Sequence, residues 1–115
     1  MLIKHVKKER TPFDLHEWND EIKAFVKPLT TFEALVFNDY AREFFDKEKS
    51  CEERFEAAFQ AAKMVLVDED GAPLLTDDDV DAVKYADFAP IFRVFSAVLT
   101  DTVPQDGEAE TAKKN

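Results

Sequence analysis

Apolar residues recur every three or four positions over most of the chain after residue 30, and this spacing predicts helices. Two stretches show it clearly. A helix after Ser50 has one apolar stripe made of Phe55, Ala58, Phe59, Ala62, Val65 and Leu66. A helix near the end has another made of Phe88, Ile91, Phe92, Phe95, Val98 and Leu99. Since each stripe occupies one face, we expect both helices to pack against a common core.

The starts of the helices are also encoded locally. Thr30–Glu33 and Ser50–Glu53 both have the capping-box pattern, in which a hydroxyl and a Glu three positions later satisfy free amides of the first turn. Thr76–Asp79 is a weaker version with Asp in place of Glu. Asp87 precedes the last helix, where Pro90 fits only within the first turn.

The helix after Thr30 has apolar residues over much of its circumference. One stripe contains Phe32, Val36, Tyr40 and Phe44, and a second contains Phe37, Ala41 and Phe45. Such a helix must be buried on two sides or contact a partner. The candidate partner-binding residues are therefore Phe32, Phe37, Tyr40, Phe44 and Phe45. We expect Phe37 and Phe45, outside the main stripe, to lie between subunits or against a client.

Before residue 30 the apolar positions alternate instead. Phe13 and Leu15 alternate with polar neighbours, as do Ile22, Ala24 and Val26, and the polar segment 18–21 lies between them. This predicts a short β-hairpin, with Pro28 ending its second strand. Residues 104–115 have almost nothing to bury and are expected to be a disordered acidic and polar tail. The predicted fold is thus mainly α, a domain of about four helices over residues 1–103.

Composition narrows the classes of function. The 115 residues include 11 Phe, and 25 acidic against 15 basic residues give a net charge of -10. A strongly negative field repels nucleic-acid phosphates and anionic lipids, so we expect neither partner. Acidity also simply keeps a Phe-rich protein soluble, and that reading stays open. No apolar run approaches a membrane span, and we expect no signal peptide, because the start Met1–Val6 has no hydrophobic stretch long enough for one.

Candidate chemistry is sparse. Cys51 is the only cysteine, which excludes an internal disulfide and is typical of the reducing cytosol. Neither His5 nor His16 has a metal-ligand spacing with other residues. The two glycines cannot form a phosphate-binding loop. With no nucleophile, base and oxyanion donor in sight, we expect no enzyme and no cofactor.

The segment Asp68–Gly71 has the look of a calcium-binding loop. Aligning Gly71 with the invariant glycine of that loop places Leu66 at the first ligand position and Pro73 at the eighth position. Leucine has no oxygen to offer, and the loop chemistry requires one there. The segment is predicted to be a solvated acidic turn in which Gly71 adopts a positive φ.

Several stretches, taken in order, resemble the tail assembly chaperones of long-tailed, lambda-like bacteriophages and prophages. They are Phe13–Trp18, Phe25–Glu33, Leu66–Gly71 and Leu75–Val80, and the likeness spans about residues 13–99. The resemblance implies a protein made in the cytoplasm of the infected bacterium and absent from the mature virion. It implies binding to the tape measure protein, help in polymerising the tail tube protein, and no catalytic residues.

Other classes remain open. A small acidic adaptor or inhibitor would bind one protein partner through the same Phe-rich helix, and a structural subunit of a particle would use it for a homo-oligomer. Gene neighbourhood separates these alternatives. Many genes of the tail chaperone family are also read with a programmed frameshift, and the ending Lys113–Asn115 can be encoded by a slippery adenine run. On that reading, residues 104–115 are a flexible linker to an extension.

Overall fold

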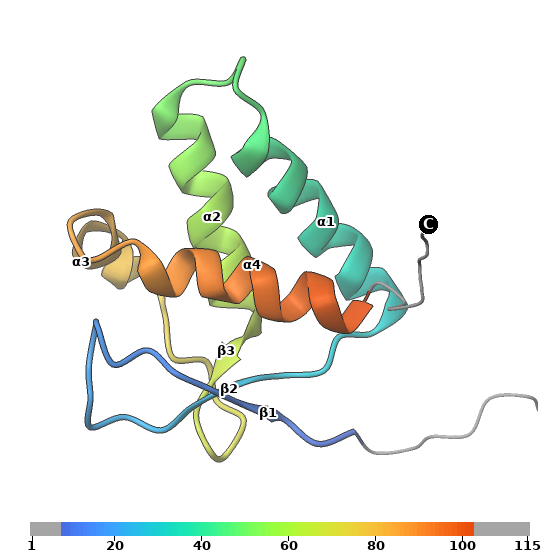
Figure 1. The fold of residues 1–115 in the computed structure, drawn as a ribbon, viewed down its shortest axis with the longest axis vertical. Coiled ribbons are helices and arrows are strands. Elements are labelled where there is room, and N and C mark those ends of the chain that lie inside the picture. Colours follow the sequence, from blue (N-terminus) through green and yellow to red (C-terminus); the bar gives the residue numbers. More distant parts are fainter. Residues whose placement is uncertain (1–7, 103–115) are drawn as a thin grey trace, which may run out of the picture.

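The computed structural model describes residues 8–102, and over this range the chain forms four α-helices, a 3₁₀ turn and three short strands (Figure 1). The elements in chain order are β1 (Thr11–Phe13), β2 (Ala24–Val26), α1 (Thr31–Phe45), α2 (Cys51–Val65), β3 (Leu66–Val67), η1 (Asp77–Asp79), α3 (Val80–Lys84) and α4 (Ala89–Thr102). The predicted mainly helical domain is confirmed. The expected tail at 104–115 and His5 lie outside the described residues.

The predicted N-terminal hairpin is confirmed, with short strands. β1 pairs antiparallel with β2, placing Phe13 opposite Ala24 and Thr11 opposite Val26. Phe13, Ala24 and Val26 are buried on the face that meets the helices. The strand ends before Pro28, as expected, because proline cannot donate to a ladder.

The sheet has a third strand that the sequence pattern did not predict. Leu66 was assigned to the stripe of the preceding helix, but α2 ends at Val65 and Leu66 already has extended dihedrals, with φ -84° and ψ 122°. β3 pairs antiparallel with β2, so that Val26 lies opposite Leu66. A completely buried apolar dipeptide has no period, so its sequence cannot distinguish a helix end from a strand.

Both predicted capping boxes at α1 and α2 are confirmed. Glu33 donates its backbone N–H to Thr30 Oγ1 at 3.1 Å, and its carboxylate accepts from the Thr30 N–H at 3.0 Å. Ser50 and Glu53 repeat this arrangement. The third predicted start, at Thr76, also forms its box, but a 3₁₀ turn and only five residues of α3 follow it.

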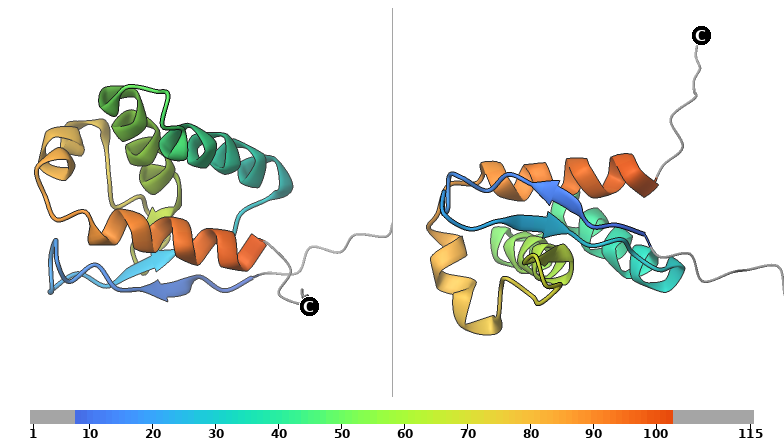
Figure 2. Two further views of the ribbon diagram at one scale, coloured as in Figure 1. Left: turned by 45° about the horizontal axis from the view of Figure 1, so that its top comes forward. Right: turned by 90° about the horizontal axis from the view of Figure 1, so that it is seen from below.

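The helices and the sheet surround one core. α1 and α2 form an antiparallel pair, and α4 runs across this pair (Figures 1 and 2). The sheet lies at the end of the pair where α2 finishes and α1 begins. Pro90 sits in the first turn of α4, as predicted, and Asp87 Oδ1 accepts from the Ala89 N–H at 2.8 Å.

Burial confirms most of the apolar stripes but corrects two residues of the last one. The side chains of Ala58, Phe59, Ala62, Ile91, Phe95 and Val98 are all in the core. In contrast, Phe88 is 69% exposed and Phe92 is 47% exposed. Val94, which was not assigned to the stripe, is completely buried. The buried face of α4 is therefore centred on Val94 and Phe95, and the two exposed rings lie beside it.

An apolar groove between the four helices

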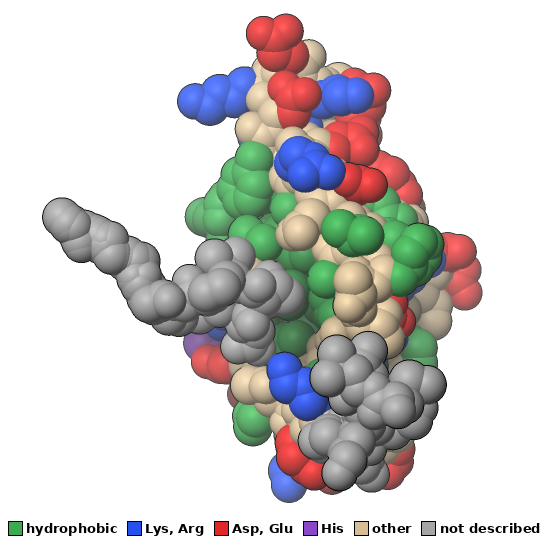
Figure 3. Space-filling view, turned by 90° about the vertical axis from the view of Figure 1, so that its right-hand side faces the viewer, with side chains coloured by type: hydrophobic (Ala, Val, Ile, Leu, Met, Phe, Trp, Pro, Cys, Tyr) green, Lys and Arg blue, Asp and Glu red, His purple; other side chains and the backbone are tan. Residues whose placement is uncertain are grey.

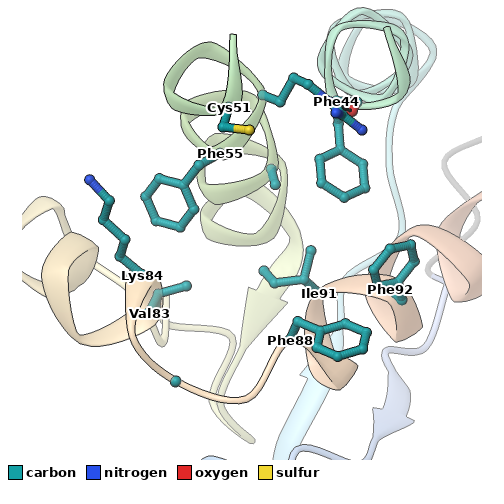
Figure 4. A pocket seen from close by; sticks show the side chains of 11 residues that line it. Phe44, Cys51, Phe55, Val83, Lys84, Phe88, Ile91 and Phe92 are labelled. Carbon is teal, nitrogen blue, oxygen red and sulfur yellow. Dashed lines mark hydrogen bonds between the residues drawn. The ribbon is translucent and has the colours of Figure 1, made fainter. Parts of the chain in front are cut away.

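Side chains from all four helices line an open apolar groove of about 260 Å³ (Figure 4). The last turn of α1 contributes Phe44, and the first turns of α2 contribute Cys51 and Phe55. The remaining lining residues are Arg54, Ala58, Val83, Lys84, Ala86, Phe88, Ile91 and Phe92. The site therefore depends on how the ends of short helices meet, and no single sequence segment defines it.

A chain of ring contacts fixes the wall formed by α1 and α4. Phe44 stacks on Phe95 with ring centroids 4.8 Å apart, and its edge faces Phe92 at 5.6 Å. Phe92 in turn has an edge contact with Phe88 at 5.4 Å. Edge and offset contacts of this kind add to the stabilisation from burial alone. The wall consequently passes from the core, at Phe95, to the solvent, at Phe88.

The lip of the groove is rich in exposed aromatic rings. Phe88 and Phe92 line the groove, while Tyr85, which caps the C-terminus of α3, is 83% exposed but is not among the lining residues. All three rings are presented by one short stretch of chain between α3 and the first turn of α4. Such clustered exposure of large apolar side chains is typical of an interaction site, whereas isolated exposed residues are common and uninformative.

Two basic side chains border the groove, and each is already engaged. Lys84 Nζ binds Glu52 Oε1 at 3.1 Å and lies 6.0 Å from the centroid of the Phe55 ring. The hydrogen bond with Glu52 raises the pKa of Lys84, which stays charged at neutral pH. Arg54 donates from Nε to the carbonyl of Phe44 at 2.8 Å, and so satisfies a free carbonyl at the end of α1.

The start of α4 is held in place by contacts with the loop after β1, including one from Arg93 to the carbonyl of Asp14. Arg93 makes a bidentate ion pair with Glu17, with N–O distances of 2.9 and 2.6 Å. The Trp18 indole N–H donates to the carbonyl of Asp87 at 2.6 Å. The hydrogen bonds from Arg93 lower the pKa of Glu17 to about 2. These contacts join segments far apart in sequence, so sequence reasoning missed them.

The structure separates the five residues proposed from the sequence as partner-binding. Phe44 lines the groove, while Phe32 is 74% exposed and Phe45 is 48% exposed on other parts of α1. Tyr40 is half-buried against the core. The expectation for Phe37 has to be corrected, because its side chain is only 1% exposed. Its ring centroid lies 5.4 Å from that of Phe95, since α4 covers this side of α1.

The groove residues missed by sequence reasoning include Phe88 and Phe92. Phe88 and Phe92 were assigned to the apolar stripe of the last helix, although that stripe already contained four other apolar residues. The large width of this apolar stripe could have indicated that some of its residues are exposed. A helix at the edge of a small core buries about one third of its circumference, and the rings beyond that width remain in solvent.

The reactive and metal-binding side chains of the described residues do not form a common site. Cys51 is exposed at the first position of α2, and His16 hydrogen-bonds with Asp14 through Nδ1 at 2.9 Å. Among residues 8–102, no three His, Cys, Asp or Glu side chains are grouped to hold a metal ion. In the same range, no helix is long and apolar enough to cross a membrane.

The acidic segment Asp68–Gly71 is a hydrogen-bonded turn. Asp68 Oδ1 accepts from the backbone N–H groups of Asp70 and Ala72 at 2.8 and 2.9 Å. Gly71 has φ +88°, as predicted, a region that other residues rarely adopt.

The chain was compared with protein-family models, curated proteins and solved structures, and none of them matches it.

Proposed function

We propose that the protein is a non-catalytic phage tail assembly chaperone, and that its groove binds an apolar helical segment of the tape measure protein. The observation that carries this proposal is the pair of rings of Phe88 and Phe92, which are extensively exposed and line a concave apolar surface. A helix laid into such a groove buries these rings together with its own apolar face. The resulting loss of apolar surface from water is the driving force for association.

The shape of the groove favours side chains of a macromolecule. It has a volume of about 260 Å³ and is lined mainly by apolar side chains. The groove is also open to solvent, and the exposed rings of Phe88 and Phe92 line it. Two or three apolar side chains from one face of a helix suit such a shape, since neighbouring turns present them at regular intervals.

The charge of the protein and its family resemblance indicate which kind of partner to expect. The net charge of -10 attracts segments with basic flanks and keeps a complex with an aggregation-prone client soluble. The four stretches that resemble tail assembly chaperones support the tape measure protein as that client, with the tail tube protein polymerising around it in the bacterial cytoplasm. On this proposal the protein contributes binding alone and no chemistry.

Calorimetric titration with peptides covering the tape measure protein of the same phage tests this function. One or more helical, apolar peptides should bind, and Phe88→Ser together with Phe92→Ser should weaken binding about tenfold or more, as expected for central aromatic residues. Phe32→Ser is the matched control, because this exposed ring lies on α1 away from the groove lining. Its affinity should equal that of the wild type.

Failure of every tape measure peptide to bind the wild-type protein would overturn the proposal. So would unchanged affinity in the Phe88 and Phe92 double variant. If the product of another neighbouring gene binds instead, with the same loss in the double variant, the protein is an adaptor or inhibitor that uses this groove.

A further inference from the structure

The charged side chains that line the groove are of one sign. Two of the described lining residues are charged, and both of them, Arg54 on α2 and Lys84 on α3, are basic. The Lys84 side chain runs beside Phe55, across the groove from Phe92 (Figure 4). In the whole chain, by contrast, 25 acidic residues outnumber 15 basic ones. The groove is therefore a positively charged apolar surface on an acidic protein.

Outside the groove, basic side chains commonly have acidic neighbours. Arg42, on the exposed side of α1, forms an ion pair with Asp39, and Lys63 on α2 forms one with Asp77. Figure 3 shows acidic and basic side chains mixed at the end of the molecule where α1 passes into α2. Neighbouring charges of opposite sign largely cancel, so such a surface does not favour a partner of either sign. The groove differs in this respect.

The guanidinium group of Arg54 is held in place but is not neutralised. Its Nε donates to the carbonyl of Phe44 at 2.8 Å, and this bond orients the planar group at the end of α1. Among residues 8–102, no carboxylate lies at ion-pair distance from Arg54, and its terminal nitrogens donate to no protein acceptor. The residue is half-buried. Since a charge is costly to enclose without a partner, a client that covers the groove has to bring an acceptor to this group.

Lys84 adds a second positive charge that is only partly compensated. Its Nζ lies 3.1 and 3.4 Å from the two carboxylate oxygens of Glu52. The Glu52 side chain is 77% exposed, and an ion pair in solvent of this kind contributes little to stability. An ammonium group donates more than one hydrogen bond, so Lys84 has capacity for a further acceptor without losing Glu52.

We propose that the groove selects apolar helical segments that carry an acidic side chain among their apolar residues, and that Arg54 binds this carboxylate through its terminal nitrogens. Lys84 attracts the same carboxylate from α3. The inference rests on the proposed function, because it states which apolar helix the groove accepts. All of these contacts are made inside one groove. The acidic residue therefore has to stand on the same face of the client helix as the apolar residues, three or four positions from one of them.

This selectivity is opposite to the one that net charge alone predicts. A net charge of -10 attracts basic segments to the protein as a whole. Inside the groove, however, a basic residue at the acidic position faces two like charges and leaves Arg54 without an acceptor. The expected client segment has its acid on the buried face and its basic residues on flanks outside the groove. A preference for acid in the groove consequently cannot arise from the overall field.

Three designed helical peptides that differ at one position test the inference. Each has leucines along one face, and the position among them is Glu, Gln or Lys. These three residues have similar helix propensities, so differences in affinity report on the groove. In NMR titrations of the isotope-labelled full chain, the Glu peptide should shift the amide signals of Phe88 and Phe92. It should bind about tenfold more tightly than the Gln peptide, as expected for one charge-assisted pair, and the Lys peptide should bind more weakly still.

Variants of the protein locate the preference. Arg54→Gln removes the charge but keeps an amide that can donate to the Phe44 carbonyl, so the Glu and Gln peptides should bind this variant equally. Lys84→Gln should reduce the preference by a smaller factor. Arg42→Gln is the matched control, because Arg42 carries the same charge on the exposed side of α1 and does not line the groove. It should keep the full preference, and circular dichroism should show the wild-type helix signal in all three variants.

Equal binding of the Glu and Gln peptides to the wild-type protein overturns the inference. The absence of binding by all three peptides does the same, as does a preference that survives both Arg54→Gln and Lys84→Gln. The proposed function is judged separately. If tape measure peptides bind without any preference for an acidic residue, the client stands and the selectivity is wrong. If the designed Glu peptide is preferred but no tape measure peptide binds, the selectivity stands and the client is a different protein.

Discussion

Arg93 on α4 donates hydrogen bonds to both carboxylate oxygens of Glu17, with N–O distances of 2.9 and 2.6 Å. Glu17 lies 76 positions earlier in the chain. The Glu17 side chain is 19% exposed and the Arg93 side chain is 33% exposed, so water screens this ion pair less than a fully solvated one. The contact ties the loop after β1 to the helix that carries the groove lip. We therefore expect protonation of Glu17 to lower the stability of the fold.

The Glu17–Arg93 pair predicts an acid-sensitive contribution to stability. The pKa of Glu17 is lowered from 4.5 to about 2, so the folded state holds the proton less tightly than the unfolded state. The contribution is complete above pH 4.5 and is lost as the pH falls towards 2. In urea unfolding, the stability difference between wild type and Glu17→Gln should shrink over this interval. Glu21→Gln, at an exposed carboxylate, is the control; a pH-independent difference for Glu17→Gln would contradict the assignment.

Phe37 and Phe45 should behave differently when substituted. Phe37→Ala removes a ring that is only 1% exposed and should cost about 3–5 kcal/mol of unfolding free energy. Phe45 is 48% exposed, so Phe45→Ala should cost clearly less and leave the helix signal unchanged. Chemical denaturation followed by circular dichroism measures both values. Equal losses of unfolding free energy in the two variants would contradict this prediction, because they would show that Phe45 contributes to the core as much as Phe37 does.

Cys51 provides a direct probe of the groove, because it is the only cysteine and lies exposed among the lining residues. An environment-sensitive fluorophore attached there should shift to shorter wavelength when a client excludes water. The control is Cys51→Ser combined with Glu69→Cys, which moves the label to the loop after β3 at the far end of the molecule (Figure 1). The label at position 69 should not respond. Equal responses at both positions would indicate a global change instead of groove binding.

Calcium should not bind specifically to the acidic turn. Leu66, at the position of the first calcium ligand, is completely buried in β3, and Asp68 Oδ1 already accepts two backbone N–H groups. Calorimetry at micromolar calcium should show no stoichiometric heat. A saturable signal that disappears in Asp70→Ala would contradict this expectation.

Local chemistry explains which parts of the fold were predictable. The starts of α1 and α2 depend on a hydroxyl and a carboxylate three residues apart, so Thr30 and Ser50 marked them correctly. The hairpin followed from alternation around Ala24 in the same way. β3 was not predictable because Leu66 and Val67 are buried on all sides, which erases the alternation that distinguishes strands.

The groove was less predictable than the fold, because it is created by contacts between helix ends. Phe44 was identified from its place in α1, whereas Phe92 was assigned to the core since periodicity gives the direction of a face and not its width. The Arg93–Glu17 pair that orients α4 has no local pattern at all. Only tertiary structure brings these residues together.

Phe44 belongs to two environments at once, since one side of its ring stacks on Phe95 in the core and its edge meets Phe92 at the groove. On the proposed function, a client that contacts this ring would also restrain the interior behind it. Occupancy and folding are thereby linked: the free energy of binding adds to that of unfolding, as for any ligand selective for the native state. If the proposed function is correct, the protein with a bound client should therefore resist proteolysis longer than the empty protein.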